Sequence, residues 1–74
     1  MLDFFSKEPA KIVEKSSKLR LESKYDKAES MLRKSLKNSK EDFLLLLELG
    51  RVYFEKKEME ESAKSLRSAY YANS

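Results

Sequence analysis

The fold is decided by residues 43–54, which read FLLLLELGRVYF. Glu48 and Arg51 are the only charged residues in this stretch, so apolar side chains cover most of the circumference of a helix. A helix that is hydrophobic most of the way round is buried between neighbouring elements. We therefore predict a helix over residues 41–56 that lies between other helices.

The flanking sequence predicts three further helices, over residues 7–22, 25–38 and 59–72. Apolar residues recur there at spacings of three and four, whereas strand-like alternation is missing. Pro9 falls where the first turn of a helix accepts proline, with Ser6 before it as the cap. The sequence therefore predicts an all-α fold of four helices.

Short polar segments separate the predicted helices at residues 23–26, 38–39 and 57–58. Ser39 is followed three residues later by Asp42, which resembles a capping box with Asp in place of Glu. We expect this pair to mark the start of the central helix.

The two halves of the chain repeat with a period of 34 residues. Large residues superimpose in six pairs, namely Ile12 with Leu46, Val13 with Leu47, Leu19 with Tyr53, Tyr25 with Met59, Leu32 with Leu66, and Leu36 with Tyr70. Small residues superimpose in three more pairs, namely Ser16 with Gly50, Ala28 with Ser62, and Ser35 with Ala69. A helix-turn-helix unit of this length is the signature of the tetratricopeptide repeat (TPR).

The second half resembles the TPR family most closely. The family's large, Leu-Gly, Tyr, Ala, aromatic and Ala positions are occupied by Leu46, Leu49, Gly50, Tyr53, Ser62, Leu66 and Ala69. The first half is similar but lacks the Leu-Gly pair, and Lys40 and Ser74 stand where the family has a terminal Pro.

The resemblance implies two antiparallel helix-turn-helix hairpins that form a fragment of a right-handed α-solenoid. Residues 1–8 would be an N-terminal lead, residues 9–42 the first repeat and residues 43–74 the second. A three-helix microtubule-interacting-and-trafficking domain is about as long and also TPR-like, but it would need a continuous helix through residues 23–26 or 57–59. About three repeats are normally needed for a stable array, so we expect the chain to belong to a longer array or to pack against a partner.

Composition excludes most catalytic and metal sites. The chain has no Cys and no His, which removes thiolate and imidazole nucleophiles, bases and ligands, and one Gly cannot form a phosphate-binding loop. Four carboxylates gather near the third turn, but Lys residues alternate with them; these are Glu55, Glu58, Glu60 and Glu61. We therefore expect no enzyme, no cofactor and no metal site.

The resemblance also implies a concave groove, lined by the first helix of each pair, that binds a peptide or a helix of another protein. The residues placed there are Val13, Glu14, Ser17, Arg20, Leu44, Leu47, Glu48, Arg51, Phe54 and Glu55. Relatives that bind the acidic tails of heat-shock chaperones use Lys and Asn where this chain has Val13, Ser17 and Glu48, so that clamp is absent. Leu44, Leu47 and Phe54 favour an apolar or amphipathic ligand instead.

Two alternatives remain open at this point. Two copies of the chain would stack into a homodimer through exposed repeat ends, at Phe4 and Phe5 or at Tyr70 and Tyr71. In the other alternative, a basic surface docks on nucleic acid or anionic lipid, because residues 1–40 carry eleven basic and six acidic groups. The lysines lack interleaved aromatic residues, so we do not expect nucleic acid to be the partner.

The expected location is cytoplasmic, because the absence of Cys suits a reducing compartment. We expect no membrane span, since the longest apolar run, Phe43 to Leu47, has only five residues. The preferred interpretation is a protein-interaction module of the adaptor or scaffold kind.

Overall fold

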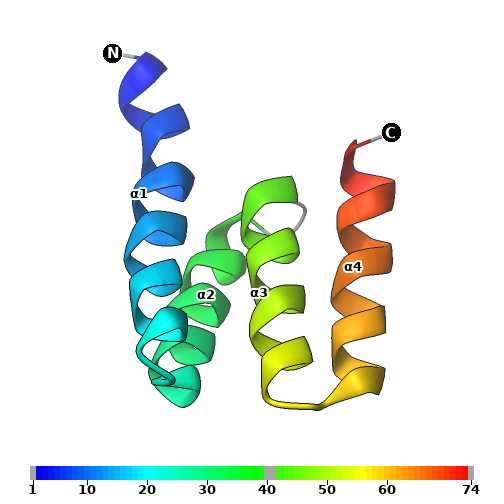
Figure 1. The fold of residues 1–74 in the computed structure, drawn as a ribbon. Helices are drawn as coiled ribbons and strands as arrows, with labels where there is room; N and C mark the ends of the chain where they lie inside the picture. Colours follow the sequence, from blue (N-terminus) through cyan, green and yellow to red (C-terminus); the bar gives the residue numbers. More distant parts are fainter. Residues whose placement is uncertain (1, 40–41, 74) are drawn as a thin grey trace.

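The computed structural model describes residues 2–39 and 42–73, with side chains described for residues 9–39 and 42–72. The described residues form four helices and no strand, which confirms the all-α prediction. The helices are α1 (Leu2–Leu21), α2 (Tyr25–Asn38), α3 (Phe43–Glu55) and α4 (Met59–Asn73). Successive helices run in opposite directions, so that α1 with α2 and α3 with α4 form two hairpins (Figure 1).

Both hairpin turns have the same backbone geometry, 34 residues apart. Ser23 and Lys57 adopt left-handed φ angles of 62° and 68°. In each turn the next amide bonds back five residues, from Lys24 N to the Leu19 carbonyl at 2.8 Å and from Glu58 N to the Tyr53 carbonyl at 2.9 Å. This is the Schellman way of ending a helix. Because both turns interrupt the helices, a three-helix domain is excluded.

The starts of α1 and α3 differ from the predictions. Helix α1 begins at Leu2 rather than near residue 7, so Pro9 lies inside it instead of in its first turn. Proline is tolerated there at the cost of one backbone hydrogen bond, because its φ angle suits a helix. At α3 the cap is Asp42, whose side chain accepts a hydrogen bond from Leu45 N at 3.0 Å, so Ser39 does not cap this helix.

Helix α3 is the centre of the molecule, as its apolar sequence predicts. It packs against α1, α2 and α4, whereas α4 contacts α3 alone among the described helices. The buried core cluster joins α2 and α3 through Ala28, Leu32, Leu45, Leu49, Val52 and Tyr53. No residue of α4 belongs to that cluster. The core therefore lies at the junction of the two hairpins rather than inside the second one.

Helices α3 and α4 approach each other closely at Gly50. A Cβ atom at this position would lie 2.6 Å from Leu66 Cδ2 and 2.8 Å from Leu66 Cγ, which is too close for a methyl group. The buried Ser62 hydroxyl donates to the Gly50 carbonyl at 2.8 Å and holds α4 against α3. The glycine thus allows the contact and the serine fixes it. No helix within the described residues has the length and hydropathy that a membrane span requires.

Candidate functional site

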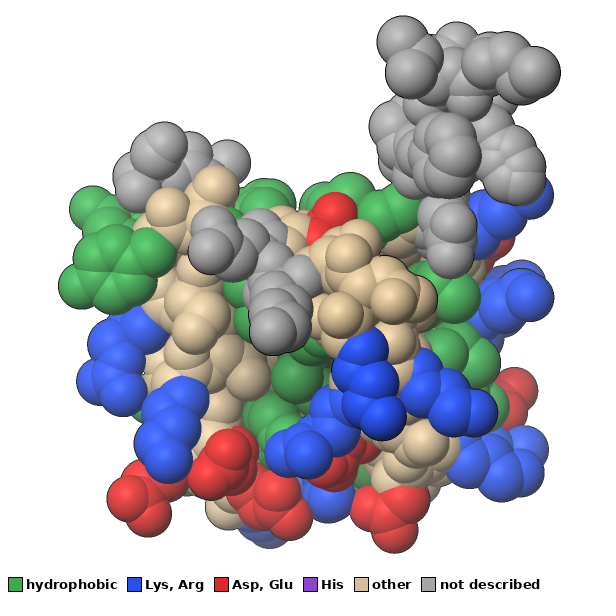
Figure 2. All heavy atoms as spheres, turned by 180° about the vertical axis from the view of Figure 1, so that it is seen from behind, with side chains coloured by type: hydrophobic (Ala, Val, Ile, Leu, Met, Phe, Trp, Pro, Cys, Tyr) green, Lys and Arg blue, Asp and Glu red, His purple; other side chains and the backbone are tan. Residues whose placement is uncertain are grey.

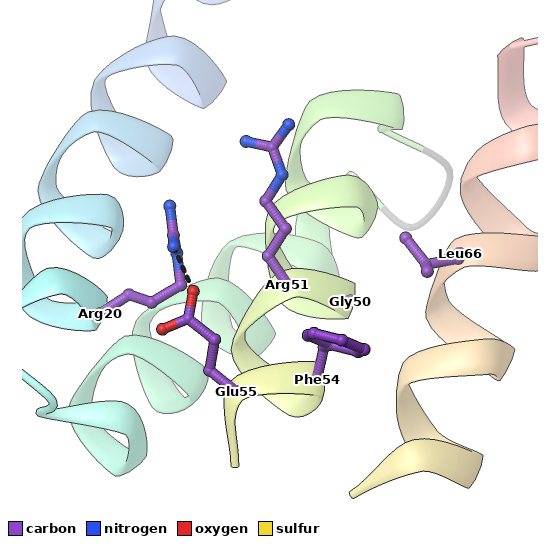
Figure 3. Close-up of a pocket in the computed structure, with 6 residues that line it drawn as sticks. All are labelled: Arg20, Gly50, Arg51, Phe54, Glu55 and Leu66. Carbon is purple, nitrogen blue, oxygen red and sulfur yellow. Dashed lines mark hydrogen bonds and ion pairs between the residues drawn. The ribbon is translucent and has the colours of Figure 1, made fainter. Parts of the chain in front are cut away.

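The candidate site is a hollow of about 400 Å³ between α1, α3 and α4. Its lining residues are Arg20, Gly50, Arg51, Phe54, Glu55 and Leu66. Phe54 and Leu66 approach each other across the gap between α3 and α4, whereas Arg20 and Glu55 meet on the side of α1 (Figure 3). The hollow therefore has an apolar half and a charged half.

The apolar half is exposed to solvent. Phe54 is 60% exposed and Leu66 is 41% exposed, although Gly50 beneath them is buried. Exposed large apolar side chains around a concavity are typical of a surface that binds another molecule. The Arg51 side chain extends from α3 beside them and adds a charged group at the rim of the hollow (Figure 3).

The charged half joins the two hairpins. Arg20 of α1 donates from Nε to Glu48 Oε2 at 2.7 Å and from Nη1 to Glu55 Oε2 at 2.5 Å, both on α3. The hydrogen bond to Glu48 is the main cause that raises the pKa of Arg20. An ion pair with two hydrogen bonds fixes orientation, so Arg20 sets how α1 lies against α3.

Glu48 is one of the most buried residues, with 1% exposure. The sequence predicts that Glu48 lies in the groove, but its carboxylate is enclosed and one of its oxygens accepts a hydrogen bond from Arg20. The other oxygen, Oε1, lies 3.6 Å from Arg51 Nη1 and forms no hydrogen bond with any described residue. Burying a carboxylate is costly unless it is paired, so Arg20 is needed to keep Glu48 in place.

The other residues placed in the groove lie in different surroundings. Val13 is half-buried and packs against the core cluster. Ser17 and Leu47 are half-buried, Glu14 is exposed, and Leu44 is 43% exposed but does not line the hollow. The structure thus brings together Arg20, Glu48, Arg51, Phe54 and Glu55 from that set.

The groove predicted from the sequence lacks two residues of the hollow, Gly50 and Leu66. The signal was present in the 34-residue repeat, because Leu66 pairs with Leu32. Leu32 is fully buried, whereas Leu66 is 41% exposed. The pairing therefore identifies Leu66 as a residue of an apolar helix face, but it predicts burial rather than the exposure that the structure shows.

The residues considered for self-association are only partly described. Tyr70 and Tyr71 are 71% and 70% exposed, and their rings meet edge to face with centroids 5.6 Å apart. Figure 2 shows a hydrophobic patch at this end of α4. Phe4 and Phe5 lie outside the residues whose side chains the structure describes.

A polar cluster fastens α2 to α3 away from the hollow. Lys56 Nζ lies 2.9 Å from Glu29 Oε1 and 3.0 Å from Asp26 Oδ1, and these hydrogen bonds raise the pKa of Lys56. The Tyr53 hydroxyl accepts from Arg33 Nη2 at 2.7 Å, and burial raises the pKa of Tyr53. A second hollow nearby is lined only by polar residues of α2, several of which these bonds already engage. The cluster therefore has a structural role.

Within residues 9–39 and 42–72, no group of three or more acidic side chains is arranged to hold a metal ion. Comparisons with family models, with curated proteins and with solved structures each find no match to this chain.

Proposed function

We propose that this chain is a non-catalytic protein-interaction module that binds a peptide or helix of another protein in the hollow between α1, α3 and α4. One observation carries the proposal: Phe54 and Leu66 are exposed on the two walls of a concavity whose rim carries Arg51 and Glu55. Apolar anchors with a few polar groups at the edge are the usual composition of such interfaces.

The proposal includes the identity of the repeat. A TPR hairpin pair would explain why small residues stand at Gly50 and Ser62 and why both turns have the same geometry. In that case the two hairpins would be a segment of a right-handed superhelix, and the chain would act as an adaptor or scaffold in the cytoplasm.

The test is selection of a displayed library of helical peptides on the wild-type protein. We expect enriched peptides to be amphipathic and to lose about tenfold or more in affinity on Phe54→Asp, because a carboxylate would replace the apolar anchor. Leu44→Asp is the matched control: it changes an exposed apolar residue of the same helix outside the hollow, and should leave affinity unchanged.

The result that contradicts the proposal is equal binding to Phe54→Asp and wild type, or no enrichment at all. Binding that falls steeply between low and moderate salt would instead support docking of a basic surface on nucleic acid or anionic lipid.

A further inference from the structure

The first hairpin already packs against a third helix of the same chain, namely α3. The apolar face of α3 presents Leu45, Leu49 and Val52 to the core cluster that contains Ala28 and Leu32. This contact within the chain is a template for how a hairpin of this sequence type binds a helix, with the helix antiparallel to the second helix of the hairpin (Figure 1).

Polar contacts fix the position of α3 on the first hairpin. They form three groups: Arg20 with Glu48 and Glu55, Arg33 with the Tyr53 hydroxyl, and Lys56 with Asp26 and Glu29. Each group joins a residue of the hairpin to a residue of α3 or of its C-terminal cap. The first hairpin therefore specifies both the apolar stripe and the charges of the helix that it binds.

The second hairpin repeats three large apolar positions of this binding face, and the described residues leave them more exposed than in the first hairpin. A shift of 34 residues takes Tyr25, Leu32 and Leu36 to Met59, Leu66 and Tyr70. The first three are half-buried or fully buried, whereas the second three are 51%, 41% and 71% exposed. We call the surface formed by Phe54, Met59, Leu66 and Tyr70 the open face.

The charges of the binding face are partly kept and partly changed. The same shift takes Arg33 to Arg67 and Asp26 to Glu60, so a cation and an anion recur, and both are exposed. It takes Arg20 to Phe54, so the cation that holds Glu48 and Glu55 on the first hairpin has no counterpart on the second. The shift also takes Glu29, which lies 2.9 Å from Lys56, to Ala63, so the open face differs from its template at two charged positions.

We propose that the open face binds an amphipathic helix of a partner protein, antiparallel to α4, with a specific residue pattern. The helix has aliphatic residues at positions 1, 5 and 8, by analogy with Leu45, Leu49 and Val52. It has Tyr at position 9 to accept from Arg67 and Lys at position 12 to pair with Glu60. Positions 4 and 11, where α3 has acidic residues, are apolar because they face Phe54.

A second copy of the chain does not supply this helix. Helix α1 has Lys11, Lys15 and Lys18 at the positions equivalent to Leu45, Leu49 and Val52, and all three lysines are exposed. Placing these lysines against the apolar open face would desolvate three cations without partners. Within the described residues, only α3 carries the required stripe, and it is already buried against α1 and α2.

The test uses two blocked helical peptides of about 18 residues, since shorter isolated helices are marginally stable. Both carry the pattern above on an Ala and Gln background; the apolar peptide has Leu at positions 4 and 11, and the acidic peptide has Glu there. Fluorescence anisotropy measures binding to the full chain and to Phe54→Arg, which recreates Arg20 in the second hairpin. Phe54 is 60% exposed, so this variant is expected to fold.

We expect the wild type to prefer the apolar peptide by about tenfold and Phe54→Arg to prefer the acidic one by a similar factor. A third peptide has Glu instead of Lys at position 12: the wild type should prefer Lys there, and a second variant, Glu60→Lys, should prefer Glu. This charge exchange tests the register independently if Phe54→Arg fails to fold.

The inference rests on the proposed function, because the open face includes the walls of the same hollow. Equal affinity for the two peptides in every variant would overturn the residue pattern, while the library-selected ligands would still support a binding module. Failure of all peptides, selected ones included, would reject both proposals. A wild-type dimer in sedimentation equilibrium that Leu66→Asp dissociates would show that a second copy occupies the open face, which also overturns the inference.

Discussion

The two hairpins share turn geometry and spacing but differ in what lies against them. The first is covered by α3, and Leu32 is completely buried there, whereas the equivalent Leu66 on the second is 41% exposed. Their outer ends differ as well, because α1 presents lysines where α3 presents aliphatic residues to the core. Figure 2 shows Lys and Arg side chains along the α1 edge and the hydrophobic patch at the opposite edge.

This difference shows that a repeated unit does not repeat its role. In a solenoid each unit is stabilised by its own packing and by the contact with its neighbour. Among the described residues, the contact between the first hairpin and α3 contains the whole core cluster. No residue of the open face belongs to that cluster, so we expect the open face to contribute less to stability than the covered face of the first hairpin.

The largest expected effect comes from truncating the same repeat position in each hairpin. Leu32→Ala should lower the free energy of unfolding by about 3 kcal/mol, because the side chain is fully buried, and Leu66→Ala by about 1 kcal/mol. Urea denaturation followed by circular dichroism measures both. Equal losses would mean that Leu66 is covered in solution and that the contrast between the hairpins is wrong.

The next effect concerns Arg20 and Phe54, which occupy equivalent positions in the two halves of the repeat. Arg20→Met should cost about 3 kcal/mol, because it removes the hydrogen-bonded cation of the buried Glu48 carboxylate and leaves only Arg51, 3.6 Å from Oε1. Phe54→Met is the matched control and should be nearly neutral. Adding Glu48→Leu to Arg20→Met should restore most of the loss in a double-mutant cycle. A double variant as unstable as Arg20→Met would show that Arg20 acts through packing rather than charge.

Much of the fold could be predicted from the sequence because its signals are local. Apolar periodicity located α2 and α4, and the polar breaks located both turns. The start of α1 was misplaced because Pro9 is equally compatible with a first turn and with a later position that sacrifices one hydrogen bond. The cap of α3 was misplaced because Ser39 and Asp42 are both good capping residues and only the backbone path decides between them.

The site was less predictable because it depends on contacts between hairpins. Glu48 looks like a solvent-facing residue of an amphipathic helix, and nothing near it in sequence shows that Arg20, 28 positions earlier, will enclose it. Leu66 looks like a core residue, and its exposure depends on the absence of a covering helix among the described residues. Sequence patterns identify which faces are apolar but not which of them receive a neighbour.

A smaller effect is expected at the polar cluster that joins α2 to α3, which has no equivalent among the described residues of the open face. The pKa values of Lys56 and Tyr53 are raised in the folded protein, so both groups hold their protons more tightly than in the unfolded chain. Their contribution is complete below about pH 10, near their ordinary pKa values, and is lost as the pH rises further. Lys56→Met should lower stability by about 1 kcal/mol at neutral pH and make the alkaline decline shallower in urea titrations. If stability falls with rising pH as steeply in Lys56→Met as in the wild type, groups other than Lys56 cause the loss.

Glycine in the two turns should give a smaller change of opposite sign. Ser23 and Lys57 have left-handed φ angles, which cost a residue with a side chain more than they cost glycine. Ser23→Gly and Lys57→Gly should each raise the free energy of unfolding by about 0.5 kcal/mol. Thermal unfolding compares the two variants, and equal gains are expected because the turns are equivalent. A gain in only one turn would show that the hairpins differ in their turns as well as in the exposure of their second helices.

The smallest effect is expected at the lysine edge, which we define as the exposed Lys11, Lys15 and Lys18 of α1. Exchanging Lys11, Lys15 and Lys18 for Gln should change stability by less than about 0.5 kcal/mol, because the side chains are exposed. It should also leave peptide binding at the open face unchanged, because that face lies on the opposite side of α3 from this edge. Stability and peptide affinity should both be measured at low and at moderate salt, for the wild type and for the variant. If binding weakens and its salt dependence becomes shallower, the lysines take part in recognition, and the basic edge rather than the open face is the surface that selects the partner.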